Sequence, residues 1–151
     1  MNLEEVHEKL ARVISELIDA NEEALVIVEG ERDVKALRGL GVTGEIVTLH
    51  RGVRVFNLCE RLAAEHRRVV ILTDWDVRGG QLARLLRDGF AANGVRVNDD
   101  LRARLAALCQ KDIKAVEDLP GFADRVAPRE EDGRRRQRSN RAWYAGRVRR
   151  P

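Results

Sequence analysis

The sequence lacks the features of membrane proteins, secreted proteins and small disulfide-stabilised proteins. No apolar run approaches the roughly 18–20 residues that a membrane-spanning helix needs. The N-terminus, MNLEEVHEKL, is acidic and has neither the basic start nor the apolar centre of a signal peptide. Cys59 and Cys109 lie far apart without a CxxC pair, which argues against a disulfide framework and a zinc site. We therefore expect a globular cytoplasmic protein that does not bind membranes.

The composition is typical of one folded domain with a charged surface. Of the 151 residues, 44% are hydrophobic and 35% are charged, so the chain has enough apolar material for a core. A single domain is expected at this length, burying roughly 68–70% of the surface of the unfolded chain. Three parts are predicted along the chain: an N-terminal helix over residues 1–21 packed on the core, an α/β domain over 22–128, and a basic tail over 129–151.

The formal net charge of +3 hides an uneven distribution. Residues 129–151 contain nine arginines and three acids, a net charge of +6, whereas the other 128 residues carry a net charge of −3. Basic tails often bind polyanions, because each cation that neutralises a phosphate releases a counterion. We therefore predict nucleic-acid contacts in the tail, at Arg134, Arg135, Arg136 and Arg138. Trp143 and Tyr144 either stack on unpaired bases or anchor the tail to the body of the protein.

Hydrophobic spacing in the body predicts strands that alternate with helices. Apolar residues three and four apart predict helices over 3–18, 31–40, 53–65, 82–90, 100–108 and 120–126. Short apolar runs predict strands over 24–28, 45–49 and 68–73, with a short further strand over 113–116. A loop is predicted over 74–80. This alternation indicates an α/β fold: a parallel sheet of about four strands with helices on both faces.

Two of the predicted strands run directly into acidic residues. Glu29 follows the first strand, and Asp74 and Asp76 follow the third. If these strands are parallel neighbours, the three carboxylates meet at the edge of the sheet where such folds bind ligands. Asp33, one helical turn after Glu29, can point the same way. Crowded carboxylates repel one another unless a cation neutralises them or some bind protons, and hard oxygen ligands suit Mg²⁺ or Mn²⁺.

The same acids have a purely structural alternative. Asp74 or Asp76 can cap the helix that follows, and Glu31 and Asp33 can lie in a first helical turn, where negative charge is favourable. One cap does not require two carboxylates, nor a third at the end of another strand. We therefore favour a metal site formed by Asp74, Asp76 and Glu29.

Two segments carry a resemblance to a known family. Residues 26–33 (VIVEGERD) and 69–80 (VVILTDWDVRGG) resemble the paired motifs of the Toprim domain of primases, topoisomerases, recombination-repair proteins and small nucleases. The resemblance covers roughly residues 22–120, and in size the chain is similar to small stand-alone Toprim proteins of archaea and bacteria. It implies that Asp74 and Asp76 are Mg²⁺ ligands and that Glu29 is a general acid/base or a further ligand. Asp33 matches an acid of the primase-like and nuclease-like branches and is the second catalytic candidate.

The chain departs from the family pattern in two places. The glycine-bearing second motif is present only as Thr48–Gly52 (TLHRG). The acidic pair that the family pattern places after the Asp-x-Asp motif has no clear counterpart: Asp99–Asp100 begins a predicted helix, and Asp112 and Glu117–Asp118 are the other candidates. The number of metal ions, one or two, is therefore open.

The resemblance implies phosphoryl transfer on RNA or DNA, with a Mg²⁺-dependent nuclease, a hydrolase of RNA processing or DNA repair, as the first hypothesis. A non-catalytic nucleic-acid-binding module is the alternative, and primase-like nucleotidyl transfer is the third. Arg32, Arg51, Arg54 and Arg78 lie near predicted strand ends, where they either clamp phosphates or are ordinary surface charges. Trp75 either stacks on a base or packs under the loop; we favour packing. The sequence predicts no particular oligomeric state.

Overall fold

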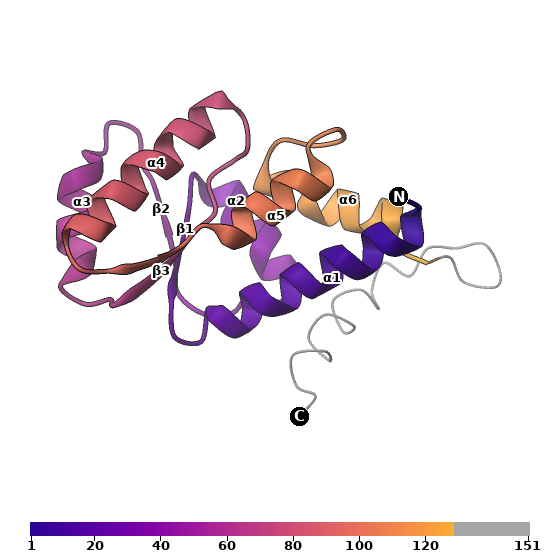
Figure 1. Cartoon of the computed structure of the whole chain (residues 1–151), viewed down its shortest axis with the longest axis horizontal. Helices are drawn as coiled ribbons and strands as arrows, with labels where there is room; N and C mark the ends of the chain where they lie inside the picture. The colour runs from indigo at the N-terminus through magenta and orange to yellow at the C-terminus, as the bar shows by residue number, and fades with distance from the viewer. Residues whose placement is uncertain (129–151) are drawn as a thin grey trace.

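The computed structural model describes residues 1–128, and its centre is a parallel sheet of four strands in the order β2-β1-β3-β4 (Figure 1). The strands are β1 (Leu25–Val28), β2 (Ile46–Thr48), β3 (Arg68–Ile71) and β4 (Arg96–Asn98). The predicted contacts of the tail, Arg134, Arg135, Arg136 and Arg138, and its Trp143 and Tyr144, lie outside the described residues. The predicted α/β fold with a parallel sheet is confirmed.

Helices cover both faces of the sheet, as expected for parallel strands joined by crossovers. They are α1 (Leu3–Ala20), α2 (Glu31–Gly39), α3 (Val55–Ala63), α4 (Val77–Ala92), α5 (Asp100–Cys109) and α6 (Leu119–Val126), with a short 3₁₀ helix, η1 (Val116–Asp118). Helices α3 and α4 pack on one face, and α1, α2, α5 and α6 contribute to the core on the other. The result is a three-layer domain (Figure 1).

Strand β1 is buried on both faces, which explains why its sequence is apolar without interruption. Successive side chains of a strand point to opposite faces, so Val26 and Val28 join the core under α1 and α5, while Leu25 and Ile27 join the core under α3 and α4. All four side chains are buried. A strand with one face in water would alternate polar and apolar residues, and β1 has no such face.

Helix α1 closes the face of the sheet opposite α3 and α4. Asn2 caps its N-terminus by accepting a hydrogen bond from the Glu5 N–H at 2.9 Å. Its apolar stripe, which includes Leu10, Ile14 and Leu17, is buried in the core shared with α5 and α6. The first helix of the chain is thus packed against two of the last helices of the described part.

The fourth strand is not where the sequence predicted it. The predicted strand over 113–116 is wrong: Ile113 and Val116 are buried in the core, but the Val116 N–H donates to the side chain of Asp74 rather than to a neighbouring strand. The fourth strand is β4, whose register with β3 pairs Val69 with Val97. This edge strand has three residues and contains one apolar residue, so hydrophobic patterning could not identify it.

The start of α4 also differs from the prediction. The loop expected over 74–80 is shorter, because Asp76 caps the helix and the helical backbone begins at Val77. No helix within residues 1–128 combines the length and the apolar character needed to cross a membrane.

A candidate acidic site at the carboxyl edge of the sheet

The pairing of β1 with β3 brings two acidic residues together. The strands are parallel neighbours, with Ile27 opposite Ile71, and the ladder continues beyond β3 through a hydrogen bond from the Leu72 N–H to the Ile27 carbonyl at 2.8 Å. Two residues further along each strand, the Asp74 N–H donates to Oε2 of Glu29 at 2.7 Å. The expected meeting of Glu29 and Asp74 at one edge therefore occurs through a direct hydrogen bond.

A tight turn connects β3 to α4 and fixes the position of Asp76. The Asp76 carboxylate accepts a hydrogen bond from the Gly79 N–H at 2.7 Å and so caps α4. The buried Thr73 hydroxyl donates to the Gly79 carbonyl at 2.7 Å across the same turn. A Cβ atom on Gly79 would lie 1.7 Å from the Asp74 carbonyl oxygen, so the turn has no room for another residue. Asp76 thus has the capping role of the structural alternative, next to the Glu29–Asp74 pair.

Residues 113–118, which we call the 113–118 segment, pack against this turn. The Val116 N–H donates to Oδ1 of Asp74 at 2.9 Å. Trp75 makes two hydrogen bonds to the segment, from its backbone N–H to the Lys114 carbonyl at 2.9 Å and from its indole N–H to the Ile113 carbonyl at 2.7 Å. Trp75 also packs against the core, as favoured from the sequence. We call the group formed by Glu29, Asp74 and Asp76 at the carboxyl ends of β1 and β3 the acidic edge. The 113–118 segment forms one wall of it.

Arg102 of α5 holds the same turn from another side. Its guanidinium group donates to two consecutive carbonyl oxygens, from Nε to Thr73 at 3.0 Å and from Nη2 to Asp74 at 2.7 Å. Arg102 is not among the residues predicted from the sequence, because nothing distinguishes it there from Arg104, the other arginine of α5. For the 113–118 segment, the sequence offered Glu117–Asp118 as candidate acids, but the contacts of the segment with the turn join residues about forty positions apart and were not predicted.

Asp33 lies beneath the acidic edge rather than on its surface. Its side chain is only 5% exposed, and Oδ2 accepts a hydrogen bond from the Gly30 N–H at 3.0 Å at the start of α2. Burial raises the pKa of Asp33 to about 6, and the negative charges of Asp74 and Glu117 add to the rise. Hydrogen bonds from the backbone N–H groups of Gly30 and Glu117 lower the pKa and only partly offset it.

Asp74 has a raised pKa for related reasons. Burial is the largest cause, and the charges of Glu29 and Asp76 together with hydrogen bonding to the Glu29 carboxyl raise the pKa of Asp74 to about 6. The hydrogen bond from the Val116 N–H acts in the opposite direction. Asp74 thus lies in an excess of negative charge, as the sequence predicted for crowded carboxylates.

The donor chemistry of this edge fits a hard divalent cation. Within residues 1–128, no three His, Cys, Asp or Glu side chains lie together closely enough to form a metal site from protein ligands alone. Mg²⁺, however, usually keeps several waters and is held by one or two carboxylates together with phosphate groups of the substrate. Glu29 and Asp74 form such a pair, and a cation would offset the repulsion from Glu29 and Asp76 that adds to the effect of burial on the pKa of Asp74. These two residues, with Asp76 beside them, can therefore hold the ion.

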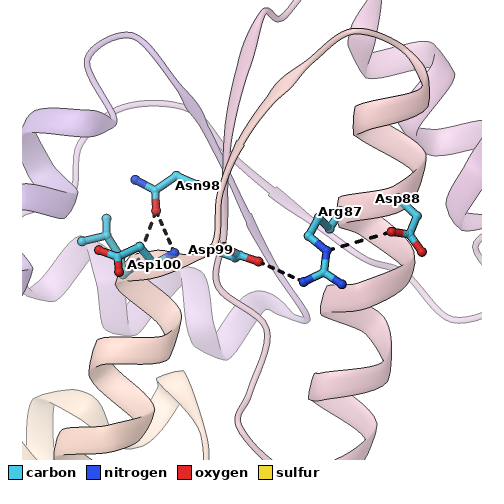
Figure 2. A network of polar contacts seen from close by, with 6 residues as sticks. Arg87, Asp88, Asn98, Asp99 and Asp100 are labelled. Carbon is cyan, nitrogen blue, oxygen red and sulfur yellow. Dashed lines mark hydrogen bonds and ion pairs between the residues drawn. The ribbon is translucent and has the colours of Figure 1, made fainter.

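Each acid of the pair Asp99–Asp100 forms an ion pair with an arginine, and Figure 2 shows Arg87 with Asp99. Asp99 forms an ion pair with Arg87 at 3.4 Å, and Asp100 forms one with Arg104 at 3.5 Å. Both lie at the start of α5, where Oδ1 of Asn98 accepts hydrogen bonds from the helix backbone. This pair therefore forms surface ion pairs at the β4–α5 connection, whereas Glu117 is the later acid whose charge acts on Asp33.

The predicted phosphate-contacting arginines of the body are exposed at the same edge. Arg32 lies in the first turn of α2, Arg78 in the first turn of α4, and Arg51 in the loop after β2. In parallel topology each of these positions follows the carboxyl end of a strand. None of the three guanidinium groups forms an ion pair or hydrogen bond with another residue in the part of the chain that the structure describes.

Comparisons with known proteins match this description. The family model for the Toprim domain matches residues 24–108. A UPF0292 protein of Methanosarcina barkeri is 37% identical over 121 residues, which cover 79% of this chain and 83% of the relative. A UPF0292 protein of Methanocaldococcus jannaschii is 32% identical over 126 residues, which cover 83% of this chain and 98% of the relative.

A solved structure is also similar to this chain. A putative protein from Aquifex aeolicus aligns with a TM-score of 0.61 and 26% sequence identity, covering 71% of this chain and 94% of that chain. The 113–118 segment lies beyond the residues that the family model matches, although it contacts Asp74.

Proposed function

The chain belongs to the Toprim domain family, and from this premise we propose that it is a Mg²⁺-dependent nuclease that hydrolyses phosphodiester bonds of RNA or DNA. Toprim domains often bind Mg²⁺ and nucleic acids. The observation that carries the proposal is the contact between the ends of β1 and β3, where Glu29 and Asp74 share a hydrogen bond of 2.7 Å. A protein that only bound nucleic acid would gain nothing from carboxylates facing phosphates.

The residues of the edge have different roles in this proposal. Glu29 and Asp74, with Asp76 beside them, hold the ion, which when bound stabilises negative charge on the reacting phosphate. Glu29 is partly exposed at the end of β1 and is the residue that transfers a proton to or from the reacting oxygen. Asp33 is too deeply buried to touch a polynucleotide, so we assign it a positioning role through its hydrogen bond to Gly30.

Cations around the edge bind the polynucleotide in this proposal. Arg32, Arg51 and Arg78 are exposed there, and guanidinium groups pair with phosphates through two parallel hydrogen bonds. The basic tail over residues 129–151 adds affinity that is independent of sequence. The acids are therefore expected to affect turnover, and the arginines to affect binding.

The test is cleavage of structured RNA and DNA by the full chain with Mg²⁺ or Mn²⁺. We expect cleavage that requires the divalent ion and falls about a hundredfold or more in Asp74→Asn, because the ion loses one of its two carboxylates. Asparagine keeps the acceptor for the Val116 N–H, so the 113–118 segment remains anchored. Asp88→Asn, an exposed change on α4, is the control and should cleave normally.

Two outcomes would contradict the nuclease proposal. The first is binding of nucleic acid without turnover on any substrate of the panel, which is the behaviour of a non-catalytic binding module. The second is cleavage that survives Asp74→Asn, which would place the reaction away from the acidic edge.

A further inference from the structure

A cavity of about 350 Å³ lies beside the acidic edge, between the loop after β2 and helix α3. Its polar lining consists of His50, Arg54, Asn57 and Arg61, and no carboxylate lines it. Two larger surface cavities at other places on the sheet are lined by several aspartate and glutamate residues. The chemistry of the smaller cavity is therefore that of an anion site.

The fold places this cavity at the same edge as Glu29. The Leu49 N–H donates to the Val28 carbonyl at 3.0 Å, so the chain after β2 still runs beside the residue that precedes Glu29. It then turns at Gly52, whose φ of +77° favours glycine, and a hydrogen bond of 3.1 Å from the Val53 N–H to the His50 carbonyl closes the turn. This turn brings His50 and the start of α3 to one cavity.

The two arginines of the cavity have no partner of their own. The guanidinium groups of Arg54 and Arg61 form no ion pair or hydrogen bond with another residue of 1–128. By contrast, Arg68 and Arg104 of the same domain are paired with carboxylates. Two unpaired guanidinium groups and an amide offer donors and positive charge to one volume, and this combination recognises phosphate.

We propose that this cavity binds one phosphate group of a polynucleotide, with Arg54 and Arg61 supplying the charge and His50 and Asn57 supplying further hydrogen bonds. The identity of the anion as a nucleic-acid phosphate rests on the proposed function. A phosphate held here lies one strand away from Glu29, so it places a neighbouring phosphodiester at the acidic edge. The bound group is either the terminal phosphate of a strand or an internal phosphate of its backbone, and both have the same chemistry.

The test measures binding without chemistry. Short single-stranded oligonucleotides of one sequence, with a 5′-phosphate or a 5′-hydroxyl, are titrated with the full chain in EDTA and followed by fluorescence anisotropy. In the double variant Arg54→Gln/Arg61→Gln we expect about tenfold weaker binding, because charge-assisted hydrogen bonds are lost. The slope of log K against log salt should fall by about 0.7 to 1.4. The double variant Arg12→Gln/Arg67→Gln removes two exposed charges elsewhere and should stay within about twofold.

The outcomes separate the two sources of phosphate. A loss confined to the 5′-phosphorylated strand assigns the cavity to a terminal phosphate, and an equal loss for both strands assigns it to an internal one. Unchanged affinity and salt slope in Arg54→Gln/Arg61→Gln overturn the proposal, as do an equal loss in the control variant and a wild-type protein that binds neither strand.

A parallel reaction with Mg²⁺ separates this proposal from the nuclease proposal. Cleavage by the wild type together with unchanged binding in Arg54→Gln/Arg61→Gln overturns the phosphate cavity alone. Weakened binding in that variant together with no cleavage by the wild type supports the cavity and contradicts the nuclease.

Discussion

The carboxyl group of Asp33 is shielded from water by the fold, and this burial lowers the stability of the folded protein at neutral pH. Its pKa is about 6 in the folded chain, against 3.8 for the ordinary group. The folded protein therefore binds this proton more tightly than the unfolded chain does. The stability that the folded protein gains from binding this proton is fully present below about pH 4 and is lost as the pH rises through 6. With two pKa units at about 1.4 kcal/mol each, the ionised carboxylate costs about 3 kcal/mol at neutral pH.

Asp33→Asn should therefore stabilise the protein at neutral pH. Asparagine removes the buried charge and keeps an oxygen for the Gly30 N–H, while the Glu117 N–H loses its acceptor, which reduces the gain. We expect the free energy of unfolding to rise by about 1–3 kcal/mol at pH 7.5 and to change much less at pH 4, measured by urea denaturation. Asp112→Asn, at an exposed position, should show no such pH dependence. An equal effect of Asp33→Asn at both pH values would contradict this assignment of cause.

Arg102 supports the acidic edge through the backbone carbonyls of Thr73 and Asp74 and does not contact a carboxylate there. Replacing it by methionine removes the donors to the Thr73 and Asp74 carbonyls but keeps much of the apolar stem. We expect a loss of about 2 kcal/mol in the free energy of unfolding. In the nuclease assay, kcat should fall while KM stays nearly unchanged, because Asp74 is displaced and the phosphate-contacting arginines are intact. A rise in KM at constant kcat would instead indicate that Arg102 binds the substrate.

At the scale of elements, the turn from β3 to α4 is the most constrained connection near the site. Gly79→Ala would place a Cβ atom 1.7 Å from the Asp74 carbonyl oxygen, so the turn must open. We expect a loss of more than about 3 kcal/mol in the free energy of unfolding, measured by thermal or urea denaturation. Gly30→Ala is the matched control, because nothing lies within 4 Å of its added Cβ, and it should cost less than about 1 kcal/mol. Similar losses at both glycines would contradict the steric explanation.

The elements also show what could be predicted from the sequence. Strands β1 and β3 were identified because burial on both faces leaves an unbroken apolar run, and their parallel pairing made the meeting of Glu29 and Asp74 predictable. Strand β4 was missed because an edge strand of three residues owes its conformation to its neighbour β3 rather than to its own composition. Ile113 and Val116 suggested a strand because buried apolar residues look alike in either conformation.

The candidate site also contains residues that could be predicted from the sequence and residues that could not. Acids that follow strands can be located from the strands, since topology brings the carboxyl ends of parallel strands together. The contacts of Arg102 and of Val116 with the turn join distant parts of the chain, and no local pattern encodes them. Burial of Asp33 likewise depends on tertiary packing, so its raised pKa could not be foreseen from its position after Glu29.

At the scale of the whole molecule, charge is divided between an acidic body and a basic tail. Residues 1–128 carry a net charge of −3 and the tail a net charge of +6. A chain without residues 129–151 should therefore bind nucleic acid more weakly and show a flatter dependence of log K on log salt, because fewer counterions are released. The measurement is a salt titration of binding for both chains. An unchanged slope would contradict a phosphate-binding role for the tail.

The contacts of the 113–118 segment have a consequence for the timing of synthesis. Glu29, Asp33, Asp74 and Asp76 all precede Val116 in the chain, and so does the turn that Trp75 anchors to this segment. Helix α1 packs against α5 and α6, which are the last two α-helices of the described residues and are synthesised long after it. During synthesis, the acidic residues are therefore present in the chain long before the 113–118 segment that packs against them. The ribosome must release nearly all of the described chain before the acidic edge takes its final shape.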